Sequence, residues 1–184
     1  MRKEAHSTED RNAAAARVTK EIERLTNLVG ALAEVTRVEG DPESRRVEHL
    51  DLDRLAQELL DARRMEADAR GCRFHFESGG ALPVRGDREL LRRAIENVLR
   101  NAIRYAPEGS AIDVRLESAA GKASIVVRDY GPGVPDEMLP RIFQPFFRAD
   151  GSRDSQTNGV GLGLAIAHRA IGAHHGQISA ENAG

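Results

Sequence analysis

The sequence predicts an α+β fold, a two-layer α/β sandwich in which helices cover one face of a mixed sheet, preceded by a long helix of the kind found in bundles. Three observations lead to this prediction. Apolar residues recur at helical spacing in several long segments, and shorter segments alternate polar and apolar residues as strands do. Turns that contain Gly or Pro separate the two kinds of segment.

The first predicted helix spans about residues 12–38. Its apolar positions repeat at alternating steps of four and three residues: Val18, Ile22, Leu25, Val29 and Leu32. A helix of about 27 residues would be about 40 Å long, more than a small domain needs, so we expect it to pair in a bundle or coiled coil. Packing on its own domain is the alternative. We place a domain boundary after residue 48, with the sandwich in residues 49–184.

The sandwich is predicted to open with a helix that Asp51 or Asp53 can cap. This helix ends near Arg70, where Gly71 suits the left-handed position that follows a helix. A polar–apolar alternation then predicts a strand at residues 73–77.

The later elements follow from the same signals. Asp87 can cap a strongly amphipathic helix that ends near Tyr105, before Pro107. The remaining predictions are a turn at Gly79-Gly80, an extended piece at Pro83-Val84, a hairpin of strands 112–116 and 124–128 turned at Gly121, a helix from Gly163 and a last strand at residues 177–180.

Composition excludes several functional classes. The chain has 27 basic and 29 acidic side chains, a formal net charge of −2, and therefore lacks the positive excess of a nucleic-acid-binding protein. A single cysteine, Cys72, forms no internal disulfide and fits a reducing compartment. No run approaches the roughly 18 apolar residues that span a bilayer. We expect this part of the protein to be cytoplasmic, with no nucleic-acid or membrane contact.

A first motif lies on the helix that Asp87 begins. Asn97, Asn101 and Arg104 fall on one arc beside its apolar face. Asparagine is a poor helix former, so two of them at i and i+4 need a reason. Amide oxygens can ligate Mg²⁺, and arginine can bind phosphate oxygens. An ordinary solvent-facing helix surface is the alternative.

The second motif, Asp129-Tyr130-Gly131-Pro132-Gly133, directly follows a predicted strand. A carboxylate there can accept a hydrogen bond from an exocyclic amine, and the glycines let a ring approach the backbone. A Pro-Gly turn that ends the strand is the alternative.

The third motif, residues 142–148, holds three of the five Phe residues inside an otherwise polar loop. These rings can anchor a mobile lid, form a small satellite core, or do both. Arg148 at its end is either a surface charge or a phosphate contact.

The fourth motif, residues 158–164, contains Gly159, Gly161 and Gly163 and leads into a helix. Glycines before a helix expose backbone N–H groups, and a helix N-terminus favours an anion. The motif is no dinucleotide fingerprint, because no strand precedes it and the third glycine falls one position early. It is no P-loop either, because no Gly-Lys-Ser/Thr occurs. The motif therefore predicts a phosphate site in a different fold.

In this order and spacing, the four motifs closely resemble the nucleotide-binding boxes of sensor histidine kinases, which are related to gyrase B, Hsp90 and MutL. The resemblance covers roughly residues 52–181 and looks most like envelope-stress-type kinases, and residues 17–38 resemble the second helix of the family's dimerisation hairpin. It implies a Bergerat-type ATP-binding fold with ATP and Mg²⁺ as ligands. The implied reaction is phosphoryl transfer to a histidine in two-component signal transduction.

The resemblance also implies roles for single residues. Asn101 would be the main Mg²⁺ ligand, Asn97 would assist it or contact phosphate through water, and Asp129 would bind the adenine amine. The other implied nucleotide-binding residues are Arg104, Tyr105, Gly131, Gly133, Ile142, Arg148, Gly159, Val160, Gly161, Leu162, Gly163 and Leu164. Residues 136–158 would form a lid that orders with nucleotide.

The family's phosphoacceptor box, a His-Glu-Leu-Arg-Thr-Pro-like hexapeptide, does not occur in the sequence. His6, the only histidine before the long helix, is not followed by Arg-Thr-Pro. We therefore expect no autophosphorylation of this chain alone, and we expect both ends to be boundaries within a longer parent. The implied partners are ATP or ADP, the kinase's own dimerisation hairpin and a response regulator receiver domain, and the implied parent is a homodimeric inner-membrane sensor.

Two other functions stay open. An ATPase switch of the gyrase, Hsp90 or MutL type would place a general-base carboxylate one turn before the Mg²⁺ ligand, where this chain has Asn97. A scaffold that binds partners without ATP is opposed by Asn101, Asp129 and the glycines, which are all present.

Overall fold

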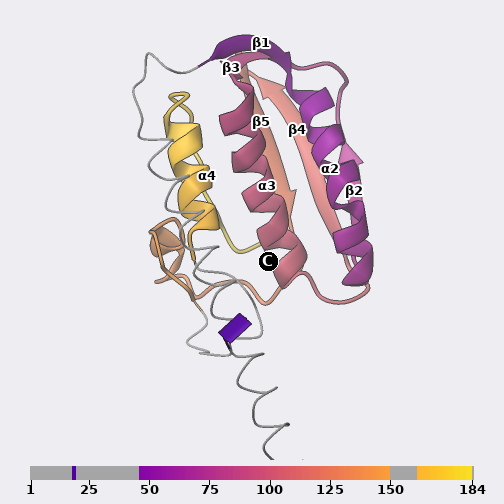
Figure 1. Ribbon diagram of the computed structural model, residues 1–184, viewed down its shortest axis with the longest axis vertical. Helices are drawn as coiled ribbons and strands as arrows, with labels where there is room; N and C mark the ends of the chain where they lie inside the picture. The colour runs from indigo at the N-terminus through magenta and orange to yellow at the C-terminus, as the bar shows by residue number, and fades with distance from the viewer. Residues whose placement is uncertain (1–17, 20–45, 150–160, 184) are drawn as a thin grey trace, which may run out of the picture.

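Helices lie on one face of a β-sheet (Figure 1). The computed structural model describes residues 18–19, 46–149 and 161–183. Its elements are β1 (Val47–Asp51), α2 (Leu52–Ala69), β2 (Arg73–Glu77), β3 (Pro83–Asp87), α3 (Arg88–Tyr105), β4 (Ala111–Ala119), β5 (Lys122–Arg128), the short 3-10 helix η2 (Leu139–Arg141) and α4 (Gly163–Gly172). The predicted α+β sandwich with helices on one face is confirmed.

The larger sheet is mixed and has the order β2-β4-β5. β2 is parallel to β4, with Phe74 opposite Ile112, and β4 is antiparallel to β5, with Val114 opposite Val127. β1 and β3 form a separate antiparallel pair. Because β2 and β4 run parallel, the chain between them must cross over, and α3 lies in this crossover.

The inner face of the sheet and the helices share one apolar core. Alternate residues of β4 are buried, namely Ile112, Val114 and Leu116, as expected for a strand with one covered face. They belong to the same cluster as Leu55 of α2 and Leu99 of α3. Each such side chain contributes about 1.5–3 kcal/mol when it is fully buried. This core fixes α3, the helix of the first motif, on the sheet.

The predicted helix ends are confirmed. The Asp87 side chain accepts hydrogen bonds from the backbone N–H groups of Glu89 and Leu90 and so caps α3. Asp51 caps α2 in the same way, and Gly71, with φ of +69°, follows its last turn. Among the described helices, none combines the length and the apolar composition needed to cross a bilayer.

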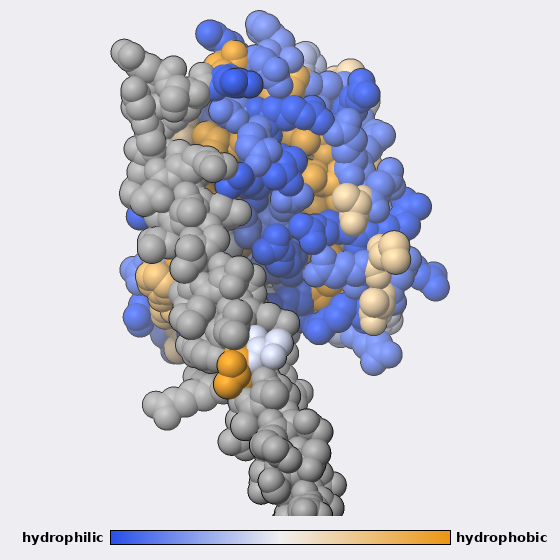
Figure 2. Space-filling view, in the orientation of Figure 1, coloured by the Kyte–Doolittle hydropathy of each residue, from blue (hydrophilic) through white to orange (hydrophobic). Residues whose placement is uncertain are grey.

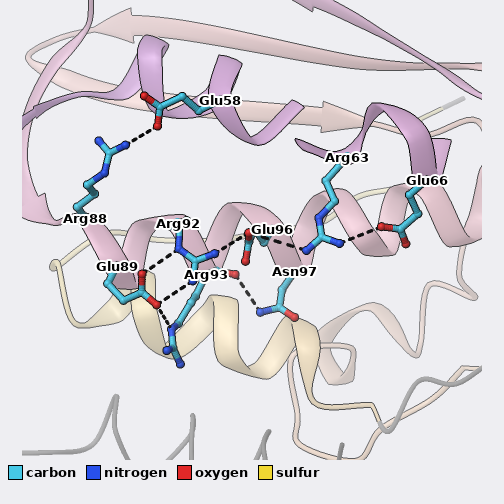
Figure 3. A network of polar contacts seen from close by, with 9 residues as sticks. All are labelled: Glu58, Arg63, Glu66, Arg88, Glu89, Arg92, Arg93, Glu96 and Asn97. Carbon is cyan, nitrogen blue, oxygen red and sulfur yellow. Dashed lines mark hydrogen bonds and ion pairs between the residues drawn. The ribbon is translucent and has the colours of Figure 1, made fainter. Parts of the chain in front are cut away.

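The outer side of the helix layer is largely hydrophilic (Figure 2). A network of ion pairs covers α3 there and reaches α2 (Figure 3). Arg92 bonds to Glu89 at 2.8 Å and to Glu96 at 2.6 Å, and Arg63 of α2 lies 3.8 Å from Glu96. The hydrogen bond from Arg92 is the main cause that lowers the pKa of Glu89 to about 2, against the opposing effect of burial.

Two strands differ from the prediction. β1 is not among the predicted elements, because four of its five residues are not buried and its sequence shows no apolar alternation. The strand predicted at residues 177–180 is wrong, since this segment forms no strand. Ile178 packs against buried residues of α3 and α4 instead. Side-chain packing therefore holds this segment, where backbone hydrogen bonds to a neighbouring strand were expected. The predicted helix at residues 12–38 lies outside the described residues, apart from Val18 and Thr19, which are helical.

Candidate nucleotide-binding site

The first part of the candidate site lies where α3 and α4 meet. Asn97 is only 8% exposed, and its Nδ2 donates a hydrogen bond of 2.9 Å to the carbonyl oxygen of Arg93 (Figure 3). Its Oδ1 faces Gly163, the first residue of α4, where an added Cβ would lie only 3.0 Å away. Beyond the other end of α4, the Asp87 N–H donates to Nε2 of His174 at 2.9 Å. Both ends of α4 are therefore held close to α3.

The other polar residues of the first motif follow along α3. Asn101 lies one turn after Asn97, on the same side of the helix, and is half-buried. The Arg104 guanidinium lies over the ring of Tyr105, with its Cζ 5.3 Å from the ring centroid. The predicted Mg²⁺ ligands and Tyr105, a predicted nucleotide-binding residue, thus occupy successive turns of one helix.

The loop after β5 meets the C-terminal end of α3. Oδ1 of Asp129 accepts a hydrogen bond of 3.0 Å from the N–H of Gly131. An added Cβ at Gly131 would lie 2.7 Å from the carbonyl oxygen of Tyr105, so only glycine fits there. The fold therefore brings together three of the predicted site residues, namely Tyr105, Asp129 and Gly131.

Tyr130 anchors the same loop to the sheet. Its hydroxyl donates a hydrogen bond of 2.6 Å to Oδ2 of Asp113 on β4, and this bond raises the pKa of the tyrosine. The guanidinium of Arg128 lies 4.8 Å from the centre of the tyrosine ring. The side chain of Tyr130 therefore contacts β4 and β5, while its neighbours Asp129 and Gly131 lie against α3.

The N-terminus of α4 has no side-chain cap. Leu162 occupies the N-cap position with a buried apolar side chain, and the first turn contains no acidic residue. Just before it, Gly161 has φ of +77°, and its carbonyl accepts a hydrogen bond of 2.9 Å from the N–H of Phe146. N–H groups at a helix start without a side-chain acceptor attract an anion, and the helix dipole adds to this attraction.

The segment that carries Arg148 lies against Gly161, just before this helix start. The carbonyl oxygen of Phe147, its neighbour, would lie 2.8 Å from a Cβ added at Gly161. Nε and Nη2 of Arg148 are buried and have no hydrogen-bond partner among the described residues. Burial of guanidinium donors without an acceptor is costly, whereas phosphate oxygens satisfy them well. The residues present therefore fit a phosphate group.

The third motif is attached to α4. The Phe143 ring stacks on His168, with ring centroids 5.7 Å apart, and Ile142 is half-buried at the end of η2. Gly159 and Val160, and the part of the predicted lid at residues 150–158, lie outside the described residues. Of the fourth motif, the structure places Gly161, Leu162, Gly163 and Leu164 at the start of α4.

The described residues contain no cluster of three His, Cys, Asp or Glu side chains that could hold a metal ion. Mg²⁺ takes oxygen ligands and keeps several waters, so one protein amide oxygen together with phosphate oxygens is a suitable set. Asn101 and Asn97 are the amides available on α3, and in Asn97 only the nitrogen is engaged by the helix backbone. This donor set fits Mg²⁺ only in company with a phosphate ligand.

Asn182 is a residue of this region that the sequence does not predict. Its Oδ1 accepts a hydrogen bond of 3.0 Å from the N–H of Val134, in the loop of the second motif. The two residues are 48 positions apart, and one asparagine in a polar segment carries no spacing signal. Only the three-dimensional contact identifies it.

Known proteins match this chain over most of its length. A family model described as histidine kinase-, DNA gyrase B- and HSP90-like ATPase matches residues 86–184. The sensor-like histidine kinase SenX3 of Mycolicibacterium smegmatis is 32% identical over 164 residues, which are 89% of this chain and 43% of SenX3. The chain thus spans less than half the length of that relative.

Two solved structures show the same fold. The mycobacterial sensor histidine kinase MprB is similar with a TM-score of 0.62 at 31% identity, over 71% of this chain and 81% of that one. The histidine kinase ThkA, in complex with the response regulator protein TrrA, is similar with a TM-score of 0.71 at 25% identity, over 88% of this chain and 45% of that one.

Proposed function

Because the chain belongs to the histidine kinase-, DNA gyrase B- and HSP90-like ATPase family, we propose that it is the ATP-binding catalytic part of a sensor histidine kinase. The observation that carries this proposal is that two buried nitrogens of the half-buried Arg148, Nε and Nη2, have no acceptor among the described residues. The segment that carries it contacts Gly161, just before the uncapped start of α4. The phosphates of a nucleotide would supply the acceptors that Arg148 and this helix start both need.

The other residues have separate tasks in this proposal. Asp129 accepts a hydrogen bond from the exocyclic amine of adenine, and Gly131 lets the loop that carries Asp129 lie directly against Tyr105. Asn101 holds Mg²⁺, and Asn97 assists it or contacts phosphate through water. Mg²⁺ supplies charge neutralisation at the phosphates.

The proposed reaction moves the γ-phosphoryl group of ATP to an imidazole nitrogen on the dimerisation hairpin of the kinase, and ADP leaves. Such transfers depend mainly on positioning and electrostatic stabilisation, which the helix start and the arginine provide. The complex of ThkA with the response regulator protein TrrA supports a receiver domain as a further partner. A homodimeric, membrane-anchored parent belongs to the same proposal.

An ATP-hydrolysing switch is the second candidate, and Asn97 argues against it. A carboxylate one turn before the Mg²⁺ ligand could act as a general base on water, whereas an amide cannot accept that proton. In this chain the position holds an amide whose nitrogen is tied to the carbonyl of Arg93. Transfer to a separate acceptor is therefore favoured over hydrolysis.

Calorimetry with the Mg²⁺ complexes of ATP, ADP and GTP tests nucleotide binding. We expect adenine nucleotides to bind with Kd in the micromolar to millimolar range, about −4 to −8 kcal/mol. Asp129→Asn should lower the affinity for ATP by at least about tenfold and reduce the preference for ATP over GTP, because the acceptor for the adenine amine is changed. Asp61→Asn, at an exposed position of α2, is the matched control. Equal binding of ATP and GTP by the unchanged protein would contradict the role of Asp129.

A second measurement separates transfer from hydrolysis. The chain is incubated with γ-labelled ATP, with and without a separately supplied dimerisation hairpin. Acid-labile label on the hairpin supports the kinase. Steady release of labelled phosphate without any acceptor would support the ATPase switch instead.

A further inference from the structure

One side chain joins the loop of the second motif to the end of the described chain. Nδ2 of Asn182 donates hydrogen bonds to the carbonyl oxygen of Val134 at 2.7 Å and to Oδ1 of Asp136 at 2.8 Å. Its Oδ1 accepts from the N–H of Val134 at 3.0 Å. The amide therefore binds both the N–H and the C=O of one residue, as a neighbouring strand would.

The loop is shaped to receive this amide. Gly133 has φ of +72°, and an added Cβ there would lie only 2.7 Å from Oδ1 of Asn182. Any larger residue at position 133 would be strained in its backbone and would also displace the amide. The contact thus depends on a glycine that the sequence assigned to the approach of the base.

Asn182 is itself held in place by its own segment. Residues 177–183 form no strand, but Ile178 packs on the cluster of buried residues that α3 and α4 share. In Figure 1 this segment runs back from the far end of α4 and ends near the C-terminal end of α3. The amide therefore ties the loop to the two helices that border the phosphate region.

The loop is consequently fixed at two points. At its start, Asp129 bonds to the N–H of Gly131, which packs against the carbonyl of Tyr105. At its far side, Asn182 holds Val134 and Asp136. A loop that is held in its binding conformation loses less entropy when the base arrives, and this raises affinity.

We propose that Asn182 is a positioning residue for adenine: it fixes the loop that begins at Asp129 and thereby sets the preference for an adenine base. This inference rests on the proposed function, because it takes Asp129 as the adenine contact. It assigns Asn182 no contact with the nucleotide. The residue acts on the base-binding part of the site and leaves the phosphate-binding part at α4 unchanged.

The test compares three ligands on the whole chain by calorimetry: Mg-ATP, Mg-GTP and Mg-tripolyphosphate, which has no base. Asn182→Ala should lower the affinity for ATP by about three- to tenfold and lower the ATP-to-GTP affinity ratio by a similar factor. The effect should be no larger, because each exposed hydrogen bond contributes little free energy to holding the loop. Tripolyphosphate should bind as before. Glu181→Ala, the exposed neighbour, is the control and should leave all three affinities unchanged.

A second pair of variants makes the result independent of general destabilisation. Asn182→Asp sets a carboxylate against the carbonyl of Val134 and the carboxylate of Asp136, so it should weaken ATP. Adding Asp136→Asn supplies an amide donor to the new carboxylate and should restore much of the affinity. Asp136→Asn alone keeps an oxygen acceptor for Asn182 and should bind ATP normally.

The outcomes separate the inference from the function on which it rests. If the unchanged protein does not bind ATP, the proposed function fails. If the unchanged protein binds ATP and the Asn182→Ala variant binds it as tightly, the positioning role is wrong. It is also wrong if this variant loses affinity for ATP and for tripolyphosphate by the same factor. Failure of the double variant to recover affinity counts against it as well.

Discussion

Arg148 is the residue whose buried donors most need a negatively charged partner. Replacing it with Met keeps an unbranched side chain and removes the charge. We expect R148M to raise the free energy of unfolding without nucleotide by about 1 kcal/mol, because two buried donors without an acceptor are removed. The same change should weaken Mg-ATP by at least about tenfold, because charge-assisted bonds to phosphate are lost.

Urea denaturation and calorimetry measure these two effects on one protein. Arg100→Met, at an exposed position of α3, is the control and should change neither quantity by much. An R148M protein that is less stable and binds ATP as before would show that Arg148 has a structural partner.

At this scale the sequence predicts the chemistry of the site better than its contacts. Asp129 after a strand and Asn101 on a helix are predicted as site residues because four motifs occur together in the order and spacing of the family. The unmet donors of Arg148 are not, because burial depends on how the loop packs. Asn182 is not predictable either, since its partner Val134 is 48 residues away and nothing local marks the pair.

Among the elements, α4 contains two glycines that offer a matched comparison. Gly163→Ala would place a Cβ 3.0 Å from Oδ1 of Asn97, whereas Gly172→Ala meets nothing within 4 Å. We expect Gly172→Ala to stabilise the protein by up to about 1 kcal/mol, because alanine favours the helix. Gly163→Ala should gain no stability and should weaken Mg-ATP several-fold, because α4 must shift away from α3.

Thermal unfolding and calorimetry on both variants test this difference. Similar stability and similar ATP affinity in the two proteins would mean that the closeness of Asn97 and Gly163 has no consequence for binding.

The ion pairs on α3 predict that the stability of the fold decreases at acidic pH. The pKa of Glu89 is lowered to about 2 from an ordinary value of 4.5. A lowered pKa stabilises the fold fully above about pH 4.5, and this stabilisation is lost as the pH falls from about 4.5 towards 2. Glu89 is half exposed, so the effect should be below about 1 kcal/mol.

The measurement is the difference in unfolding free energy between the unchanged protein and Glu89→Gln at pH 7 and at pH 3. This difference should be smaller at pH 3. Glu181→Gln removes the same charge outside the helix layer and serves as the reference. A difference that stays constant between the two pH values would contradict the role of Glu89.

The elements themselves were predictable where the signal is local. Capping residues and helical periodicity give α2 and α3, and polar–apolar alternation gives β2 and the β4–β5 hairpin. β1 has only Leu50 buried and depends on its distant partner β3, so no local pattern reveals it. Residues 177–180 show the opposite case, because their strand-like composition is overridden by packing of Ile178 and by the amide of Asn182.

For the whole molecule, the site draws on α3, the loop after β5, the start of α4 and the segment of Asn182. A ligand that binds such a site only in the folded state stabilises the entire fold. We expect Mg-ATP at a hundredfold excess over its Kd to raise the free energy of unfolding by about 2.7 kcal/mol. Urea denaturation with and without nucleotide measures this gain, and Asp129→Asn should show less of it at the same concentration.

The parallel pairing of β2 with β4 has a consequence for how freely the two sides of the phosphate region can move. α3 lies within the chain that connects these neighbouring strands, and its Leu99 and Ile103 are buried in the core that it shares with the sheet, so it cannot leave the sheet without exposing that core. Its amide hydrogens should therefore exchange with solvent only through global unfolding. α4 lies outside that connection, after β5, and can open locally at a lower free energy. The asparagines thus stand on a rigid helix, and α4, which we propose to bind the phosphates, is the more mobile of the two.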